Sequence, residues 1–531
     1  MKHHDDLSPD LTRRGFVGLV ATGVAAASGL TLGGGCDDAG VSGRVPADPR
    51  PDTVFPELAT TPFSLGIASG DPLSDSVILW TRLLPASEVL PDSDIPIYWE
   101  VAVDPEFETL VHRGITQASP VFAHAVHVDV QGLDAATNYW FRFEVGVWQS
   151  TIGKTRTLPA ADASPETLRF AFTSCQHYED GYYAAHRHLA AEDVDLVLFL
   201  GDYIYEGGPR SGNVRIHDRP EVTTLEGYRS RYALYKRDPD LQSAHASAPW
   251  VVTWDDHDVE NNYAGTVPQD PGEAATFADR RAAAYQAFYE HHPVRVMPPA
   301  ADGSLQIYRT IDYGDLVRFF VVDTRQYRTD QPCDDQPSGP CADYGDGSDS
   351  MLGDAQERWL LDGLAQTPGH WTIMAQSVVF SPVPIGGLLN FDQWDGYPTS
   401  RARILDAVEA NAVANFVVLT GDIHAAGIGD IMRDPTAETP QLLGTELVAP
   451  SVTSNAFDNR ATTAVVERLV QAEPAIRYFN MSEHGYALCT VTRARLRTEF
   501  KYVAALDDPA ASISVGATFL IASGVPGAER V

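Results

Sequence analysis

Three short apolar segments of this chain each end in acidic residues. Residues 195–200 and 415–420 are both followed by Gly-Asp. Residues 250–254 are followed by Asp-Asp-His-Asp. A continuous apolar run of this length is typical of a strand buried on both faces, as in a parallel sheet covered by helices. Ligands of such sheets bind beyond the carboxyl ends of the strands. The pattern therefore predicts that several strands bring carboxylates and imidazoles to one sheet edge.

The region from residue 63 to 158 shows a different pattern, in which apolar and polar positions alternate over short runs. It predicts an antiparallel β-sandwich of roughly a hundred residues. The segment before Tyr139 resembles the corner of fibronectin-like domains. His124 and His127 could be metal ligands, but they lie three positions apart in an alternating strand and so face opposite ways, which favours packing or surface histidines. The predicted strands are 76–80, 97–102, 124–130 and 139–145.

After residue 165 the pattern changes to strands that alternate with helices, which predicts an α/β catalytic domain of sheets covered by helices. The helices are predicted at 181–192 and 354–364, and further strands at 317–323 and 371–376. A chain of 531 residues is too long for one ordinary core. The predicted organisation is a signal region (1–36), a linker (37–54), an all-β fibronectin-like sandwich (55–158), a catalytic domain (166–505) and a C-terminal tail (506–531).

The first residues of the chain predict an export address. Arg13 and Arg14 precede a weakly apolar, Gly-rich stretch at 19–32, which resembles a twin-arginine export signal. A short membrane anchor is the alternative, but the stretch is short for a span. Cys36 could carry a lipid anchor. We therefore expect the twin-arginine export machinery as a partner and a periplasmic, cell-surface or secreted location.

The charge of the chain limits its partners. The formal net charge is −34, which argues against nucleic acid or an anionic membrane, because both require clustered Lys and Arg. It does not argue against a phosphate substrate, since a metal centre supplies positive charge locally. Cys333 and Cys341 flank a short polar loop, and we expect them to form a disulfide in an oxidising compartment.

Residues with metal-binding chemistry follow the predicted strands of the catalytic region. A thiolate and a phenolate suit a ferric ion, whereas carboxylates, amides and water suit Ca, Mg or Mn. Each residue has an ordinary alternative, such as a turn, a helix cap, an inert buried Cys or a packed Tyr. Their common position after strands of one domain favours a mixed metal site. The candidates are Cys175, Asp202, Tyr205, Asp255, Asp256, His257, Asn262, Asp422 and His424.

Four motifs in this order resemble the PhoD-type alkaline phosphatases, and more distantly the calcineurin-like metallophosphoesterases. They are Phe172-Thr-Ser-Cys-Gln176, Gly201-Asp-Tyr-Ile-Tyr205, Trp254-Asp-Asp-His-Asp-Val-Glu-Asn-Asn262 and Gly421-Asp-Ile-His424. The resemblance implies secretion by the twin-arginine route and two kinds of metal ion. Fe³⁺ would be held by Cys175, Asp202, Tyr205 and His424, and Ca²⁺ by Asp202, Asp256, Asp422 and Asn262. Asp256 and Asp422 stand where the wider superfamily has Asn and His, which favours calcium over zinc.

The implied function is a secreted, metal-dependent hydrolase of phosphomonoesters or phosphodiesters. The metals would neutralise the phosphate, and His257 would protonate the leaving oxygen. Arg229 and Arg231 are candidates for gripping substrate oxygens, although a surface location suits them equally. A phospholipase D-type phosphodiesterase would use the same centre. A non-catalytic cell-surface binding protein is a third hypothesis. The absence of metal-ligating residues from the four motifs would favour it, and none of these residues is missing.

Overall fold

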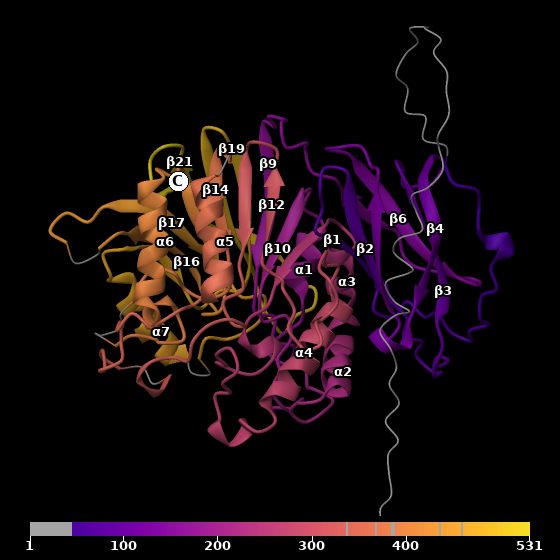
Figure 1. Cartoon of the computed structure of the whole chain (residues 1–531), viewed down its shortest axis with the longest axis horizontal. Coiled ribbons are helices and arrows are strands. Elements are labelled where there is room, and N and C mark those ends of the chain that lie inside the picture. Colours follow the sequence, from indigo (N-terminus) through magenta and orange to yellow (C-terminus); the bar gives the residue numbers. More distant parts are fainter. Residues whose placement is uncertain (1–44, 336–337, 367–368, 384–387, 435–436, 458–459) are drawn as a thin grey trace, which may run out of the picture. The chain divides into compact units, whose positions relative to one another are not determined.

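The structure, a computed structural model, describes residues 45–531 except 336–337, 367–368, 384–387, 435–436 and 458–459 (Figure 1). Within this part of the chain, no helix is both long and apolar enough to cross a membrane. Arg13, Arg14 and Cys36 lie outside the described residues. The export signal and the lipid anchor therefore stay predictions.

Two mixed sheets form the centre of the described chain. One has ten strands in the order β22 (Glu529–Arg530), β21 (Ile513–Ala522), β20 (Arg495–Val503), β19 (Gly485–Thr492), β9 (Thr167–Thr173), β10 (Leu196–Leu200), β11 (Trp250–Thr253), β1 (Ile67–Gly70), β2 (Ser76–Arg82) and β5 (Ala125–Gln131). The other has seven in the order β12 (Arg309–Tyr313), β13 (Val317–Val321), β14 (Trp371–Ala375), β15 (Phe416–Thr420), β17 (Leu442–Val448), β16 (Ala426–Met432) and β18 (Ile476–Asn480).

The central strands of each sheet are parallel, as the continuous apolar runs predict. β10 lies between β9 and β11 and is parallel to both. β13, β14, β15 and β17 form a second parallel set. Antiparallel strands flank both sets, so neither sheet is parallel throughout. Parallel neighbours place their carboxyl ends at the same sheet edge. The prediction of a single edge is wrong, however, because the site takes residues after β9, β10 and β11 of one sheet and after β15 of the other.

The alternating faces of β10 explain why its sequence is apolar throughout. Leu196, Leu198 and Leu200 pack between the two sheets, in the same cluster as Phe319 of β13. Val197 and Phe199 face the other way and pack in a separate cluster with helices. Each central strand is thus covered by a sheet on one face and by helices on the other, whereas the sequence alone predicts burial on both faces without saying what provides it.

Helices cover the outer faces of both sheets. α1 (Ala184–Leu189), α2 (Leu225–Lys236), α3 (Pro239–His245) and α4 (Phe277–His291) share a core with β9, β10 and β11. α5 (Gly353–Ala365) and α6 (Pro398–Ala410) pack on β13, β14 and β15. In Figure 1 these two groups are the magenta and the orange helices. α7 (Arg460–Gln471) packs beside β18. α1 is shorter than the helix predicted at 181–192.

The N-terminal strands do form two packed sheets. β3 (Ile95–Ala102), β4 (Leu110–Ala118), β6 (Asn138–Val145), β7 (Trp148–Gln149) and β8 (Gly153–Arg156) make one sheet, and its apolar face packs on β1, β2 and β5. The Tyr139 hydroxyl accepts a hydrogen bond of 2.8 Å from the Asp134 N–H, as a tyrosine corner does. Here the partner sheet is not separate, because Gly70 of β1 pairs with Trp250 of β11.

The end of the chain differs from the expected tail. The segment after residue 505 contains β21 and β22, and β21 pairs with β20 along nearly its whole length. Ala517, Phe519 and Ile521 point into the core between the two sheets. Alternating apolar residues therefore give these last strands a core-facing side, and they extend the ten-stranded sheet.

Candidate metal centre

Five of the seven predicted metal ligands have a left-handed backbone. The φ angles are 58° for Cys175, 56° for Asp202, 52° for Asn262, 65° for Asp422 and 53° for His424. Non-glycine residues rarely adopt this conformation, which costs free energy, and it concentrates at functional sites. These residues lie in the tight turns directly after β9, β10 and β15 or in the loop after β11. The turns point the side chains back across the sheet edge instead of continuing the strand.

The glycine in each Gly-Asp motif allows two such turns to approach each other. A Cβ on Gly201 would lie 2.4 Å from Cβ of Asp255, and a Cβ on Gly421 would lie 2.7 Å from Oγ of Ser174. Neither distance is tolerated by real side chains. Backbone hydrogen bonds of 3.1 Å join Cys175 N–H to Gly201 and Gln176 N–H to Asp202. The motifs are therefore needed to pack neighbouring turns.

Cys175, Asp202, Tyr205 and His424 meet at one point. Potential ligand atoms of Cys175, Asp202 and His424 lie within 4.8 Å of one another. The Tyr205 hydroxyl donates to Asp202 Oδ2 at 2.8 Å and lies 3.0 Å from His424 Nε2. His424 Nδ1 lies 3.0 Å from the Asn455 carbonyl oxygen, so its N–H points there and Nε2 is left for a metal.

A second group, made of oxygen donors, lies beside the first. Asp255, Asp256 and Asp422 form one candidate cluster, and Asp202, Asp256 and His257 form another. Asp256 accepts the Asn262 backbone N–H at 2.8 Å, which holds that loop close. Asp255 is instead bonded to Arg325. This arrangement supports Asp256 over Asp255 as the ligand, and Asp202 is shared by both groups.

One oxygen atom of each of three buried carboxylates in this cluster lacks a hydrogen-bond partner. These atoms are Asp202 Oδ1, Asp255 Oδ2 and Asp256 Oδ1. A buried oxygen anion without a partner is costly, and a bound cation removes that cost. Burial, and then Asp256 and Asp392, raise the pKa of Asp422 to about 7. The sulfur, phenol, imidazole and carboxylate groups are suitable metal ligands. A bound metal ion would also give the unpaired carboxylate oxygens a partner.

Burial also acts on the thiol and the phenol of the first group. Burial, and then the charge of Asp202, raise the pKa of both the Cys175 thiol and the Tyr205 phenol well above their usual values. Neither side chain ionises easily among carboxylates. A nearby cation reverses this effect because it stabilises the anionic forms.

His257 is oriented by a carboxylate that the sequence did not single out. Its Nδ1 lies 2.8 Å from Glu206 Oε2, and Glu206 Oε1 accepts the Asn261 N–H at 2.9 Å. Nε2 is therefore the free ring nitrogen. Burial would lower the pKa of His257, but Glu206, Asp256 and Asp202 outweigh it and raise the pKa well above the usual value. His257 can hold a proton beside the cluster.

Comparisons with known proteins match this organisation. The model of the PhoD-like phosphatase family matches residues 170–500, and that of the PhoD-like phosphatase N-terminal domain matches residues 50–159. The chain is 42% identical over 490 residues to alkaline phosphatase D of Bacillus subtilis (strain 168), covering 90% of this chain and 83% of the relative. A solved structure of PhoD superposes with a TM-score of 0.86 at 42% identity, covering 90% of this chain and 93% of the other.

The chain belongs to the PhoD-like phosphatase family. It is thus a phosphoric ester hydrolase of the PhoD type, and its substrates are phosphate esters. The four sequence motifs, from Phe172 to His424, all lie inside the matched catalytic region. The resemblance found in the sequence is confirmed.

In this PhoD-like phosphatase, the two candidate substrate-binding arginines lie elsewhere. Arg229 forms a bidentate ion pair with Glu290 of α4, with N–O distances of 2.5 and 2.7 Å. Arg231 is 1% exposed and donates to the backbone oxygens of Tyr205 and Gly207. Both guanidinium groups have partners within the protein, and their contact with substrate stays a prediction. Arg231 fixes the segment that carries Tyr205.

Two further residues organise the PhoD-like centre. Asp258 accepts the backbone N–H groups of Asp202 and Asp255 at 3.0 Å, and those of Tyr203 and Ile204 at 3.2 and 3.3 Å. It ties the turn after β10 to the loop after β11. The third motif includes Asp258, but its spacing alone did not reveal this contact.

Arg325 is the buried cation beneath the oxygen-rich group. It contacts Asp255 and Asp392 at 2.5 and 2.6 Å, and Asp256 and Asp422 at 3.6 and 3.9 Å. It stands four residues beyond the end of β13, and no motif marked it. Its charge offsets part of the repulsion among the carboxylates.

The predicted cysteine pair lies outside the centre. Cys333 and Cys341 form a disulfide with their Cα atoms 5.7 Å apart. Their sulfur atoms are therefore not available to a metal, although Asp343 lies nearby. Cys175 remains a free thiol.

Proposed function

We propose that this PhoD-like phosphatase hydrolyses phosphate esters at a mixed centre of ferric iron and calcium. The observation that carries the proposal is the shared position of Asp202, between a group with sulfur, phenol and imidazole donors and a group of carboxylates. Fe³⁺ suits the first group, Cys175, Asp202, Tyr205 and His424. Ca²⁺ suits Asp202, Asp256 and Asp422 with the Asn262 amide, because it prefers oxygen ligands.

Bound at these residues, the metals would supply positive charge for the phosphate oxygens and would lower the pKa of a coordinated water. The side chains then divide the remaining work. His257 holds a proton at Nε2 for the departing alcohol oxygen, and Glu206 keeps the ring in that orientation through Nδ1. Asp258 and Arg325 keep the ligand-bearing turns in place.

Export of the folded enzyme is also part of this proposal. Arg13 and Arg14 support the twin-arginine route. The Cys333–Cys341 disulfide supports an oxidising destination, because disulfides persist there.

Metal analysis of the purified enzyme, together with p-nitrophenyl phosphate and bis(p-nitrophenyl) phosphate as substrates, tests the centre. We expect iron and calcium, visible colour from thiolate and phenolate charge transfer, loss of activity with EGTA and recovery with calcium. Tyr205→Phe should shift or bleach the visible band. Full activity in a colourless, iron-free preparation would refute the ferric assignment, and recovery with zinc but not calcium would refute the calcium assignment.

Asp202→Ala gives the sharpest variant, because it removes the carboxylate common to both groups. We expect loss of turnover and of bound metal, with the circular dichroism spectrum retained because β10 stays covered on both faces. Asp92→Ala, at an exposed loop position, is the matched control. Near-normal activity of Asp202→Ala would show that the two groups do not share this residue.

A further inference from the structure

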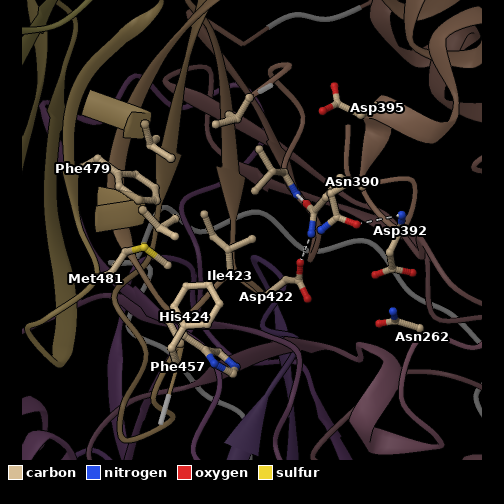
Figure 2. A pocket seen from close by; sticks show the side chains of 16 residues that line it. Asn262, Asn390, Asp392, Asp395, Asp422, Ile423, His424, Phe457, Phe479 and Met481 are labelled. Carbon is tan, nitrogen blue, oxygen red and sulfur yellow. Dashed lines mark hydrogen bonds between the residues drawn. The ribbon is translucent and has the colours of Figure 1, made fainter. Parts of the chain in front are cut away.

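The cavity beside the metal centre has two chemically different ends. Its volume is about 290 Å³. Figure 2 shows Asp422, Asn262 and Asp392 at one end, and Ile423, Phe479 and Met481 at the other. His424 also lines the cavity. The apolar end therefore begins directly beside two proposed metal ligands.

The apolar end is a packed wall. Phe479 and Met481 are only 5% and 7% exposed, and they share one apolar cluster with Val466 and Val470 of α7. Two hydrogen bonds hold α7 against this wall. Gln471 donates to the Phe479 carbonyl at 2.7 Å, and Glu467 accepts the Met481 N–H at 3.1 Å. The wall is therefore held by contacts within the protein.

An apolar wall adds nothing to the recognition of phosphate itself. Phosphate is held by cations and hydrogen-bond donors, whereas an apolar wall stabilises only groups that leave water to contact it. Because Asn262, Asp422 and His424 line the cavity, an ester group on a phosphate held at the centre would face it. The occupant that fits both ends is thus one molecule with an anionic and an apolar part.

We propose that this cavity binds an apolar alcohol portion of the phosphate ester, an alkyl chain or an aromatic ring, and so sets the substrate preference. This inference rests on the proposed function, because it places the phosphate at the metal centre. Its volume of about 290 Å³ suits a small organic group and is too small for a protein segment. Phe457 lines the cavity and is 41% exposed, so the cavity reaches the protein surface there. A longer chain could extend outward at this point.

Alkylphosphonates test the inference without turnover, because their carbon–phosphorus bond resists hydrolysis. Binding of methyl-, butyl- and hexylphosphonate to the metal-loaded enzyme is measured by titration calorimetry and by inhibition of p-nitrophenyl phosphate hydrolysis. We expect the affinity to rise about twofold for each added methylene that is partly buried and about fourfold for each that is fully buried. All three compounds stay monomeric at the concentrations used, which micelle controls check.

Two variants and a matched control assign the effect to the wall. Val466→Thr and Met481→Gln keep side-chain size but add polar atoms, and each should lower the hexyl-to-methyl affinity ratio about three- to tenfold. Val465→Thr makes the same Val-to-Thr change on the preceding residue of α7, which is 60% exposed. The control should keep the wild-type ratio and the wild-type rate of p-nitrophenyl phosphate hydrolysis.

The outcomes separate this inference from the proposed function. Equal affinity for the three phosphonates, in an enzyme that hydrolyses p-nitrophenyl phosphate, overturns the apolar subsite and leaves the hydrolase intact. A chain-length effect that all three variants retain places the apolar group elsewhere and also overturns it. If no ester is hydrolysed and no phosphonate binds, the proposed function itself fails.

Discussion

At the scale of single residues, the centre depends on backbone strain as much as on ligand chemistry. Cys175, Asp202, Asp422 and His424 all follow strands and all have positive φ angles. Such conformations persist only when the surroundings enforce them. Here β10 and β15 are fully buried, β9 is buried over its last four residues, and Gly201 and Gly421 let the turns meet.

His257→Ala tests the role of an oriented proton donor. We expect metal content to stay close to wild type and the rate on alkyl phosphates to fall by roughly 10²–10⁴. The defect should shrink for p-nitrophenyl esters, because p-nitrophenolate leaves without a proton. Rates for both leaving groups, measured with the same metal loading, check this. Equal losses for good and poor leaving groups would assign His257 to metal or phosphate binding instead.

At the scale of elements, the centre is assembled by loops that belong to different strands. Asp258 alone receives four backbone N–H groups from the segments after β10 and β11. Arg231 of α2 reaches the backbone of Tyr205. Helix and loop contacts thus fix the distance between ligands that lie far apart in the sequence.

Asp258→Ala should disrupt this tether. Removing the carboxylate leaves up to four buried N–H groups without an acceptor, each at a cost of about 1–3 kcal/mol. We expect a clear fall in the unfolding temperature and weaker metal retention, although Asp258 is not a proposed ligand. Asp92→Ala in an exposed loop is the control. Thermal unfolding with and without EGTA measures both effects, and an unchanged unfolding temperature would contradict the tether.

At the scale of the whole described chain, the N-terminal strands complete the catalytic sheet. β1 pairs with β11, and Trp80 of β2 donates from its indole to the Glu290 carbonyl of α4 at 3.0 Å. His127 of β5 contacts the His292 carbonyl at 2.8 Å. The N-terminal region therefore covers an edge and an apolar surface of the catalytic region.

A chain that lacks residues 45–158 should therefore be unstable. Deletion of these residues exposes the edge of β11 and the side chains that contact Trp80. Exposed strand edges pair with other chains. We expect aggregation on size-exclusion chromatography, where the full chain elutes as a defined species. A soluble, active fragment 159–531 would show that the catalytic region folds alone.

Buried histidines make the free energy of unfolding depend on pH. Burial, and then Arg215, lower the pKa of His186 from 6.5 to about 3. Below pH 6.5 the unfolded state binds a proton that the native state does not, so the free energy of unfolding falls as pH falls toward 3. The slope is up to about 1.4 kcal/mol per pH unit. Above pH 6.5 this effect is absent.

Urea unfolding of the metal-free protein between pH 7 and pH 5 measures this slope. His186→Gln should unfold more easily at pH 7 but lose less stability on acidification than wild type. His112→Gln on β4 is the control and should keep the wild-type slope. The same slope in His186→Gln and wild type would contradict the assignment.

The sequence alone determined the local features of this protein. Apolar runs of strand length located β10, β11 and β15, because a strand between two layers needs apolar residues at nearly every position. Alternation located β2, β3, β5 and β6 for the corresponding reason. The ligand candidates after β9, β10 and β11 followed, because residues directly after parallel strands of one sheet share its edge. Asp422 and His424 follow β15 of the other sheet, and only the packing of the two sheets brings them to the same site.

The tertiary structure decided what depends on distant neighbours. Glu206, Arg325 and Asp392 acquire their roles only through contacts with segments more than 50 residues away, which no local pattern records. Arg229 and Arg231 resemble substrate ligands in the sequence, but the fold gives them partners within the protein. Strand propensity fixes which residues extend and turn, whereas packing fixes which side chains meet.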